Sequence, residues 1–268
     1  MAKAHLIGIT GVPGTGKSFF ARSACDIGPT AVAMIDPKEM TFYAEQKMVE
    51  AGISKLTGAD SDAVKLIADL DWRPHMRSFK ATGFQDLLRW VAARETDDSK
   101  YIVIDPMSEV SDLALHEVLK VHSTNDPGDL SHGRAYTGHD QLFKQLLTEL
   151  RRLVVRGKTV ICTFHGKMKE LEGAGDAKKG VGMSGGQEWQ FEEQMLPVFN
   201  SSYRQHIHSP FDLWLYTVTT GYGPGRKYYL TAQADNVRPA KHSVKFKAGA
   251  QIARIPNTLK DLLEMLDE

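Results

Sequence analysis

The chain has 268 residues, of which 42% are hydrophobic and 25% are charged, and its 33 lysines and arginines balance its 33 aspartates and glutamates. A chain of this length buries a sizeable core, and its zero net charge weighs against a protein that coats nucleic acid through bulk positive charge alone, although not against a local basic groove. Its two cysteines form no metal or disulfide motif, and no apolar run reaches the roughly 18 residues of a membrane span, so we expect a soluble cytoplasmic protein with no membrane partner.

The first predicted elements are a strand, a glycine-rich loop and a helix. Residues 6–10 are a short apolar run, residues 11–18 match the pattern G-x-x-x-x-G-K-[ST], and residues 18–24 are compatible with a helix. This context is typical of a phosphate-binding loop, whose backbone N–H groups surround phosphate oxygens. Lys17 is expected to reach the β- and γ-phosphates of a nucleotide, and the Ser18 hydroxyl to ligate Mg²⁺. The residues expected to bind the nucleotide are Gly11, Val12, Pro13, Gly14, Thr15, Gly16, Lys17, Ser18 and Phe19.

The remaining elements predict an α/β protein. Strands are expected over residues 30–35, 100–105, 159–165, 211–218 and 227–232, and helices around 40–51, 62–70, 84–94, 140–155 and 257–268. Strands that alternate with helices favour a mostly parallel sheet flanked by helices, and the last two strands add an antiparallel edge hairpin. We therefore expect one P-loop NTPase domain over 1–268, with long functional or mobile loops near 122–139 and 165–210.

Polar residues at the ends of three strands complete the predicted site. Asp105 ends an apolar strand and is expected to face the Mg²⁺ bound through Ser18, although a strand also ends in Asp simply before a turn. We favour Glu39 as the base that activates water, with Asp36 and Glu109 as competitors. His165, at the end of another strand, is a candidate sensor of the γ-phosphate.

The order of these motifs resembles the RecA-type P-loop ATPases of tailed phages, in particular the short single-strand-annealing ATPases of recombination modules. The resemblance rests on residues 11–18, 35–39, 101–108, 163–165 and 211–214, the hairpin, and the basic element 238–241. It spans about residues 5–247, and only the phosphate loop is specific. Pro106 replaces the serine that usually follows the strand acid in this group.

The resemblance implies a RecA-like core that binds ATP and Mg²⁺ and hydrolyses the phosphoric anhydride. It implies a homo-oligomer with the nucleotide between subunits, single-stranded DNA as a partner and, for a viral chain, the host cytoplasm as its location. By position, Glu39 matches the catalytic acid and His165 the polar sensor. Arg238 and Lys241 match basic residues that reach the γ-phosphate of a neighbouring subunit.

The predicted loops leave the partner open. Lysines at 167, 169, 178 and 179 are interleaved with acids at 170, 172 and 176, and the densest basic region lies between 226 and 247. Trp189 and Phe191 can either stack on bases or anchor the loop to the core. A DNA-stimulated ATPase is the first hypothesis, and a motor or loader that acts on a protein partner is the alternative. A small-molecule kinase is disfavoured because no arginine lies between His165 and Tyr203.

Overall fold

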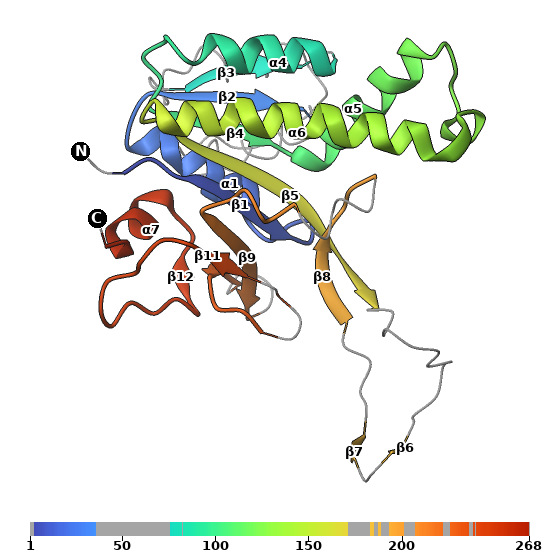
Figure 1. Cartoon of the computed structure of the whole chain (residues 1–268). Helices are drawn as coiled ribbons and strands as arrows, with labels where there is room; N and C mark the ends of the chain where they lie inside the picture. Colours follow the sequence, from blue (N-terminus) through green and yellow to red (C-terminus); the bar gives the residue numbers. More distant parts are fainter. Residues whose placement is uncertain are drawn as a thin grey trace, which may run out of the picture.

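A computed structural model describes residues 3–35, 76–81, 83–170, 183–184, 187–188, 193–200, 207–221, 226–235, 238 and 240–267 (Figure 1). The helices expected around 40–51 and 62–70 lie outside these ranges. The described helices are α1 (Lys17–Arg22), α4 (Phe84–Ala93), α5 (Met107–Val121), α6 (Arg134–Val155) and α7 (Leu259–Met265), with short 3-10 turns η1 (Ser23–Asp26), η2 (Pro127–Asp129) and η3 (Ser131–Gly133).

The strands form one main sheet. Its order is β12 (Ile255–Pro256), β10 (Lys227–Thr231), β9 (Leu213–Thr220), β1 (Leu6–Gly11), β5 (Thr159–Glu170), β4 (Tyr101–Asp105), β2 (Thr30–Met34) and β3 (Met76–Lys80). All neighbours from β9 to β3 pair parallel, whereas β10 and β12 pair antiparallel at the edge. The predicted fold class, a mostly parallel α/β sheet with an antiparallel edge hairpin, is confirmed. Because β5 lies between β1 and β4, the strand that precedes the phosphate loop and the strand that carries Asp105 end at the same edge without pairing.

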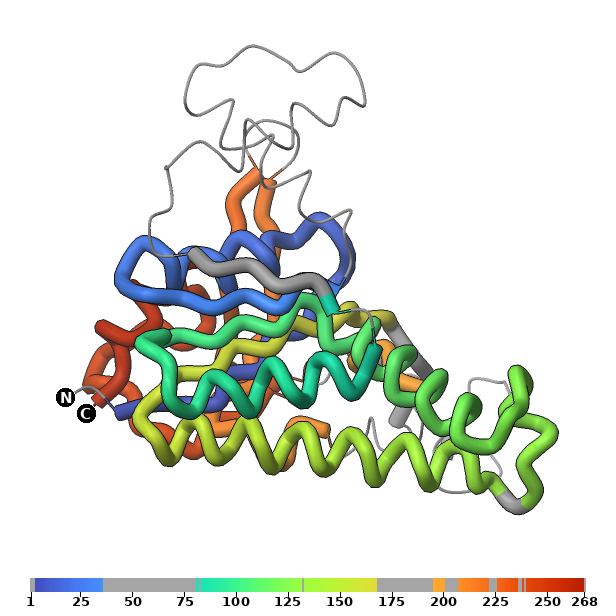
Figure 2. The backbone as a smooth tube through the Cα atoms, turned by 90° about the horizontal axis from the view of Figure 1, so that it is seen from above, coloured from blue at the N-terminus to red at the C-terminus, as the bar shows by residue number. Residues whose placement is uncertain are grey.

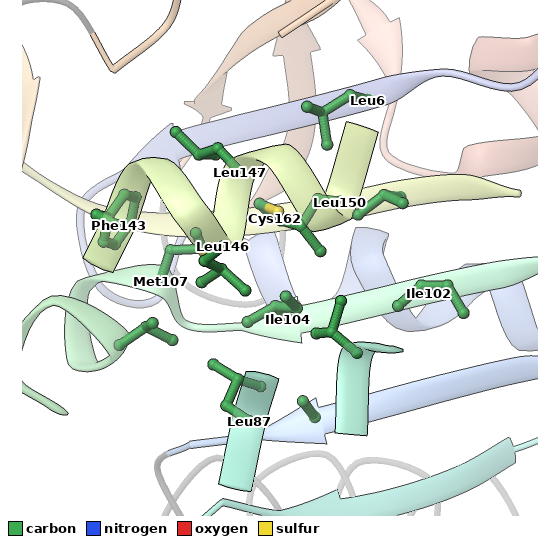
Figure 3. Packing of buried hydrophobic residues seen from close by; sticks show 14 of the residues in the cluster. Leu6, Leu87, Ile102, Ile104, Met107, Phe143, Leu146, Leu147, Leu150 and Cys162 are labelled. Carbon is green, nitrogen blue, oxygen red and sulfur yellow. The ribbon is translucent and has the colours of Figure 1, made fainter. Parts of the chain in front are cut away.

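Successive residues of a strand pack alternately into two hydrophobic layers, one on each face of the sheet. Leu6 and Ile102 pack with helices α4, α5 and α6 on one face (Figure 3), whereas Ile7 and Val103 pack with α1 and α7 on the other. This alternation follows from the two-residue period of a strand. The strand 6–11 is buried throughout because both faces of the sheet are covered. Figure 2 shows α6 running along the sheet beside α4, with the ends of α5 and α6 projecting beyond it.

The helices after Asp105 differ from the sequence prediction. Helix α5 was not predicted, and α6 begins at Arg134 rather than at residue 140, so the segment 122–139 holds η2, η3 and the first turn of α6 instead of one long loop. At the start of α6 only Ala135 and His139 are buried, which is too sparse an apolar pattern to mark a helix from sequence. Among the described residues, no helix is long and apolar enough to cross a membrane.

Strand β5 is longer than the predicted strand over 159–165. It continues to Glu170, and its far half pairs antiparallel with β8 (Glu193–Pro197), so that Gly166 lies opposite Pro197 and Glu170 opposite Glu193. A second small pair, β6 (Met183–Ser184) and β7 (Gln187–Glu188), lies farther along the same segment. The β5–β8 ribbon projects from the sheet (Figure 1), so part of the segment expected to be loop over 165–210 is a two-stranded ribbon.

Candidate functional site

The phosphate loop is shaped by its glycines and by strand β9. Gly14 and Gly16 have φ angles of 74° and 86°, in the left-handed region that favours glycine. A Cβ atom on Gly11 would lie 1.8 Å from Thr217 Oγ1 and 2.8 Å from Thr15 Oγ1. A side chain at Gly11 is therefore sterically excluded by the strand beside it, and the loop has room only for its backbone.

Lys17 is held over the loop rather than extended into solvent. Its side chain is only 5% exposed, and Nζ donates a hydrogen bond to the Val12 carbonyl at 3.0 Å. Thr15 Oγ1 donates to the same carbonyl at 2.7 Å and accepts from Thr217 Oγ1 at 2.6 Å. The loop therefore carries a nearly buried cation whose position is fixed by the main chain around it, which is a strong attraction for phosphate oxygens.

The Asp105 carboxylate accepts hydrogen bonds from side chains of two other elements, α1 and β5. Ser18 Oγ donates to its Oδ1 at 3.3 Å, and Thr163 Oγ1, from β5, donates to the same oxygen at 2.5 Å. Arg22 Nη2 lies 3.5 Å from Oδ2, and the Arg22 and Asp105 side chains are each 1% exposed. The structure thus brings Ser18 and Asp105 together as the sequence predicted, and adds Arg22, one helical turn after Ser18, as a buried counter-charge.

This arrangement fits a Mg²⁺ site that is completed by a ligand. A hydroxyl and a carboxylate are oxygen donors of the kind that Mg²⁺ prefers, usually together with waters and substrate phosphates. Within the described part of the chain, no group of three or more His, Cys, Asp and Glu side chains could hold a metal by itself. Ser18 and Asp105 would therefore hold the ion only with phosphate oxygens from the nucleotide.

His165 lies on the same sheet edge as the phosphate loop. In the parallel pairing of β1 and β5 it is the register partner of Gly11, and its backbone N–H donates to Ser108 Oγ at 3.0 Å. Ser108 is on α5, three residues after Asp105, and a further α5 hydroxyl, Ser111 Oγ, accepts from the Asn200 backbone N–H at 3.1 Å. Helix α5 therefore contacts β5 at His165, just before the ribbon, and also the segment that follows β8.

The predicted general base is not placed. Glu39 and its competitor Asp36 lie outside the described residues. The other competitor, Glu109, is in the first turn of α5. The assignment of Glu39 as the base stays a prediction.

The two predicted basic residues contact their own chain and not its phosphate loop. Arg238 Nε lies 3.3 Å from Asp235 Oδ2, and Lys241 Nζ donates to the Ser209 carbonyl at 2.5 Å. Lys241 pairs with Trp214, which in turn aligns with Gly8 on β1, upstream of the loop. The assignment of Arg238 and Lys241 to the γ-phosphate of a neighbouring subunit stays a prediction.

Sequence reasoning missed three residues at this site. Arg22 is the one charged residue in the segment 19–24, and its position one turn after Ser18 was the available signal. Thr217 and Asn257 carry no such signal, because they reach the loop from 202 and 241 residues away in the sequence.

A family model described as an AAA domain matches residues 3–244. Among solved structures, the chain is similar to a KaiC-like protein from the hyperthermophilic archaeon Pyrococcus horikoshii OT3, with 14% sequence identity over 92% of this chain and 87% of that chain and a TM-score of 0.41. No curated protein matches the chain.

Proposed function

The chain belongs to the AAA domain family, and on that premise we propose that it is a Mg²⁺-dependent ATPase that works as a RecA-like homo-oligomer on single-stranded DNA. The observation that supports the proposal most is the meeting of Ser18 with Asp105 beside the Lys17 loop. A nucleoside triphosphate needs a cradle of N–H groups, a cation and a metal ligand set, and these residues supply all three.

In this account each side chain has one task. The loop backbone and Lys17 hold the β- and γ-phosphates, and Ser18 and Asp105 hold Mg²⁺. The bound ion would neutralise charge that develops on the phosphate oxygens. Glu39 accepts a proton from the attacking water, and His165 reads the presence of the γ-phosphate. Absence of a guanine-reading Asn-Lys-x-Asp sequence favours ATP over GTP.

The position of the ribbon supports an action on a second macromolecule. The β5–β8 ribbon begins at Gly166, directly after His165. A movement of His165 on contact with the γ-phosphate would therefore be passed along the backbone to the ribbon. DNA as that partner rests on the resemblance to recombination and annealing ATPases. A protein partner, as for a packaging motor or helicase loader, is the second candidate because the sequence of this segment interleaves lysines at 167 and 169 with acids at 170 and 172.

Steady-state ATP hydrolysis with Mg²⁺, with and without single-stranded DNA and at two salt concentrations, tests the proposal. Stimulation by single strands that falls with added salt is expected, because phosphate contacts release counterions. ATP turnover that is the same with and without single-stranded DNA would still support an ATPase, but it would favour the protein-directed alternative. An absence of turnover under all of these conditions would contradict the proposal as a whole.

A further inference from the structure

Two side chains from the C-terminal part of the chain lie against the phosphate loop at Gly16. A Cβ atom on Gly16 would lie 2.7 Å from Asn257 Nδ2 and 3.4 Å from the Tyr228 ring. Asn257 Nδ2 donates a hydrogen bond to the Gly16 carbonyl at 3.1 Å. The loop is therefore bordered on this side by an aromatic ring and an amide.

Both residues are held by regular structure. Tyr228 is on β10, where it pairs with Thr219 of β9. Asn257 directly follows β12, and the Leu259 backbone N–H behind it donates to Ser23 Oγ at 2.8 Å, which ties the start of α7 to the end of α1. Asn257 lies beyond residues 3–244, the part of the chain that the family model matches.

Tyr228 is exposed where its neighbours on the same sheet face are buried. Its side chain is 38% exposed, whereas Leu230, on the same face of β10, is 0% exposed and packs with the α1 and α7 layer. An aromatic ring that is partly open to solvent at the rim of a phosphate loop provides a flat apolar surface for a planar ligand.

The side-chain amide of Asn257 gives a second indication that a ligand binds here. Its side chain is 8% exposed, and among the described residues its Oδ1 atom is buried without a hydrogen-bond partner. Buried polar atoms are satisfied in the great majority of cases, so this acceptor calls for a donor that the described residues do not provide. A bound ligand or its hydration water can supply that donor.

We propose that Tyr228 is the stacking platform for the nucleobase, and that Asn257 is a positioning residue that fixes Gly16 beside it. The inference rests on the proposed function, because it assumes that the loop binds a nucleoside triphosphate. Stacking depends on ring area more than on hydrogen-bonding pattern, so purine nucleotides bind more tightly than pyrimidine nucleotides.

Inorganic triphosphate lacks a nucleobase, so its affinity distinguishes contacts to the phosphates from contacts to the base. We would measure by calorimetry the affinities of the full chain for ATP, CTP and inorganic triphosphate. Tyr228→Ala should weaken ATP binding by about fivefold to 150-fold and leave the affinity for inorganic triphosphate unchanged, because stacking on one base is worth about 1–3 kcal/mol, which corresponds to this fold-change. Tyr228→Phe, which keeps the ring, should bind ATP as the wild type does.

Two further variants control for folding and for general surface effects. Tyr228→Leu keeps an apolar side chain without the ring and should lose ATP affinity as Tyr228→Ala does. Tyr136→Ala removes a tyrosine of similar exposure, 43%, from α6 and should change nothing. An unchanged ATP affinity in Tyr228→Ala, or an equal loss for inorganic triphosphate, would overturn the platform.

Asn257→Ala gives the complementary result. It should weaken ATP and inorganic triphosphate by the same factor, because it loosens the loop and not the base contact. An effect on neither ligand would overturn its positioning role. A wild-type chain that binds neither ATP nor inorganic triphosphate would instead contradict the proposed function, and this outcome is distinct from a failure of the Tyr228 variants.

Discussion

Arg22 and Asp105 form a fully buried ion pair at the centre of the site, with Nη2 and Oδ2 3.5 Å apart and each side chain 1% exposed. Removing one member of such a pair leaves an uncompensated charge in the interior. The pair therefore links the stability of the fold to the acid that we assign to Mg²⁺.

Arg22→Met should destabilise the protein strongly. We expect a loss near the lower end of about 3–5 kcal/mol in the free energy of unfolding, because Ser18 and Thr163 still donate to Asp105. Urea denaturation measures it, and adding Asp105→Asn should restore part of the stability. Arg152→Met, at a 56% exposed arginine that pairs with Glu95 and Glu149, is the control and should cost less than about 1 kcal/mol. Equal losses in the two arginine variants would contradict this reading of the pair.

Gly11→Ala should disrupt the phosphate loop. The new Cβ would lie 1.8 Å from Thr217 Oγ1, so β9 or the loop must move, and both stability and ATP affinity should fall. Removing the hydroxyl in Gly11→Ala/Thr217→Ala should recover part of both. Thermal unfolding and calorimetry provide the measurements. Gly83→Ala, at an extended position with open space around it, should be tolerated. A Gly11→Ala variant with wild-type stability and wild-type ATP affinity would show that the loop is not packed as described.

Asp97 should make the stability depend on acid pH. Burial raises the pKa of Asp97, but hydrogen bonds from Lys158 and Ser99 outweigh it, so the pKa lies below its usual value. A lowered carboxyl pKa contributes stability above the unfolded value, and this contribution disappears as the pH falls through the folded value. The difference in unfolding free energy between wild type and Asp97→Asn should therefore be largest at pH 7 and shrink below about pH 4. Urea titrations at pH 7, 5 and 3 test this, and a difference that grows toward pH 3 would contradict it.

Arg238 and Lys241 should act in trans. Arg238→Ala and Lys241→Ala should each impair ATP hydrolysis, and mixing either variant with Lys17→Ala protein should restore some activity. Rescue is expected because a mixed interface can combine an intact loop from one subunit with intact basic residues from another. Steady-state turnover of the mixtures measures it. An absence of rescue at every mixing ratio would argue against a shared site.

The strands and the phosphate loop could be predicted because their signals are local. The apolar run before Gly11 and the run that ends at Asp105 are short, continuous and buried on both faces, and parallel strand ends meet at one edge. The proximity of Ser18 to Asp105 could therefore be predicted from the sequence alone.

The contacts that complete the site could not be predicted in this way. From the sequence, Arg22 is expected to be an exposed helix residue, because a buried arginine is rare unless it is paired. Its partner Asp105 lies 83 residues away in the sequence, so the pair has no local signal. Asn257 reaches Gly16 across 241 residues through the register of β10 and β12, which no local periodicity encodes. Helix α5, in contrast, had a local signal that was overlooked, because its buried residues Met107, Val110, Ala114 and Val118 recur at helical spacing.

Titration of ATP hydrolysis with Mg²⁺ tests the central claim most directly, with wild type compared with Lys17→Ala and Asp105→Asn. We expect saturable, Mg²⁺-dependent turnover in the wild type, none in Lys17→Ala, and in Asp105→Asn a loss of turnover or a shift to higher Mg²⁺. Lys260→Ala, at a 68% exposed lysine of α7, should match the wild type. Turnover that persists in Lys17→Ala, or that is identical in Asp105→Asn at every Mg²⁺ concentration, would contradict the account.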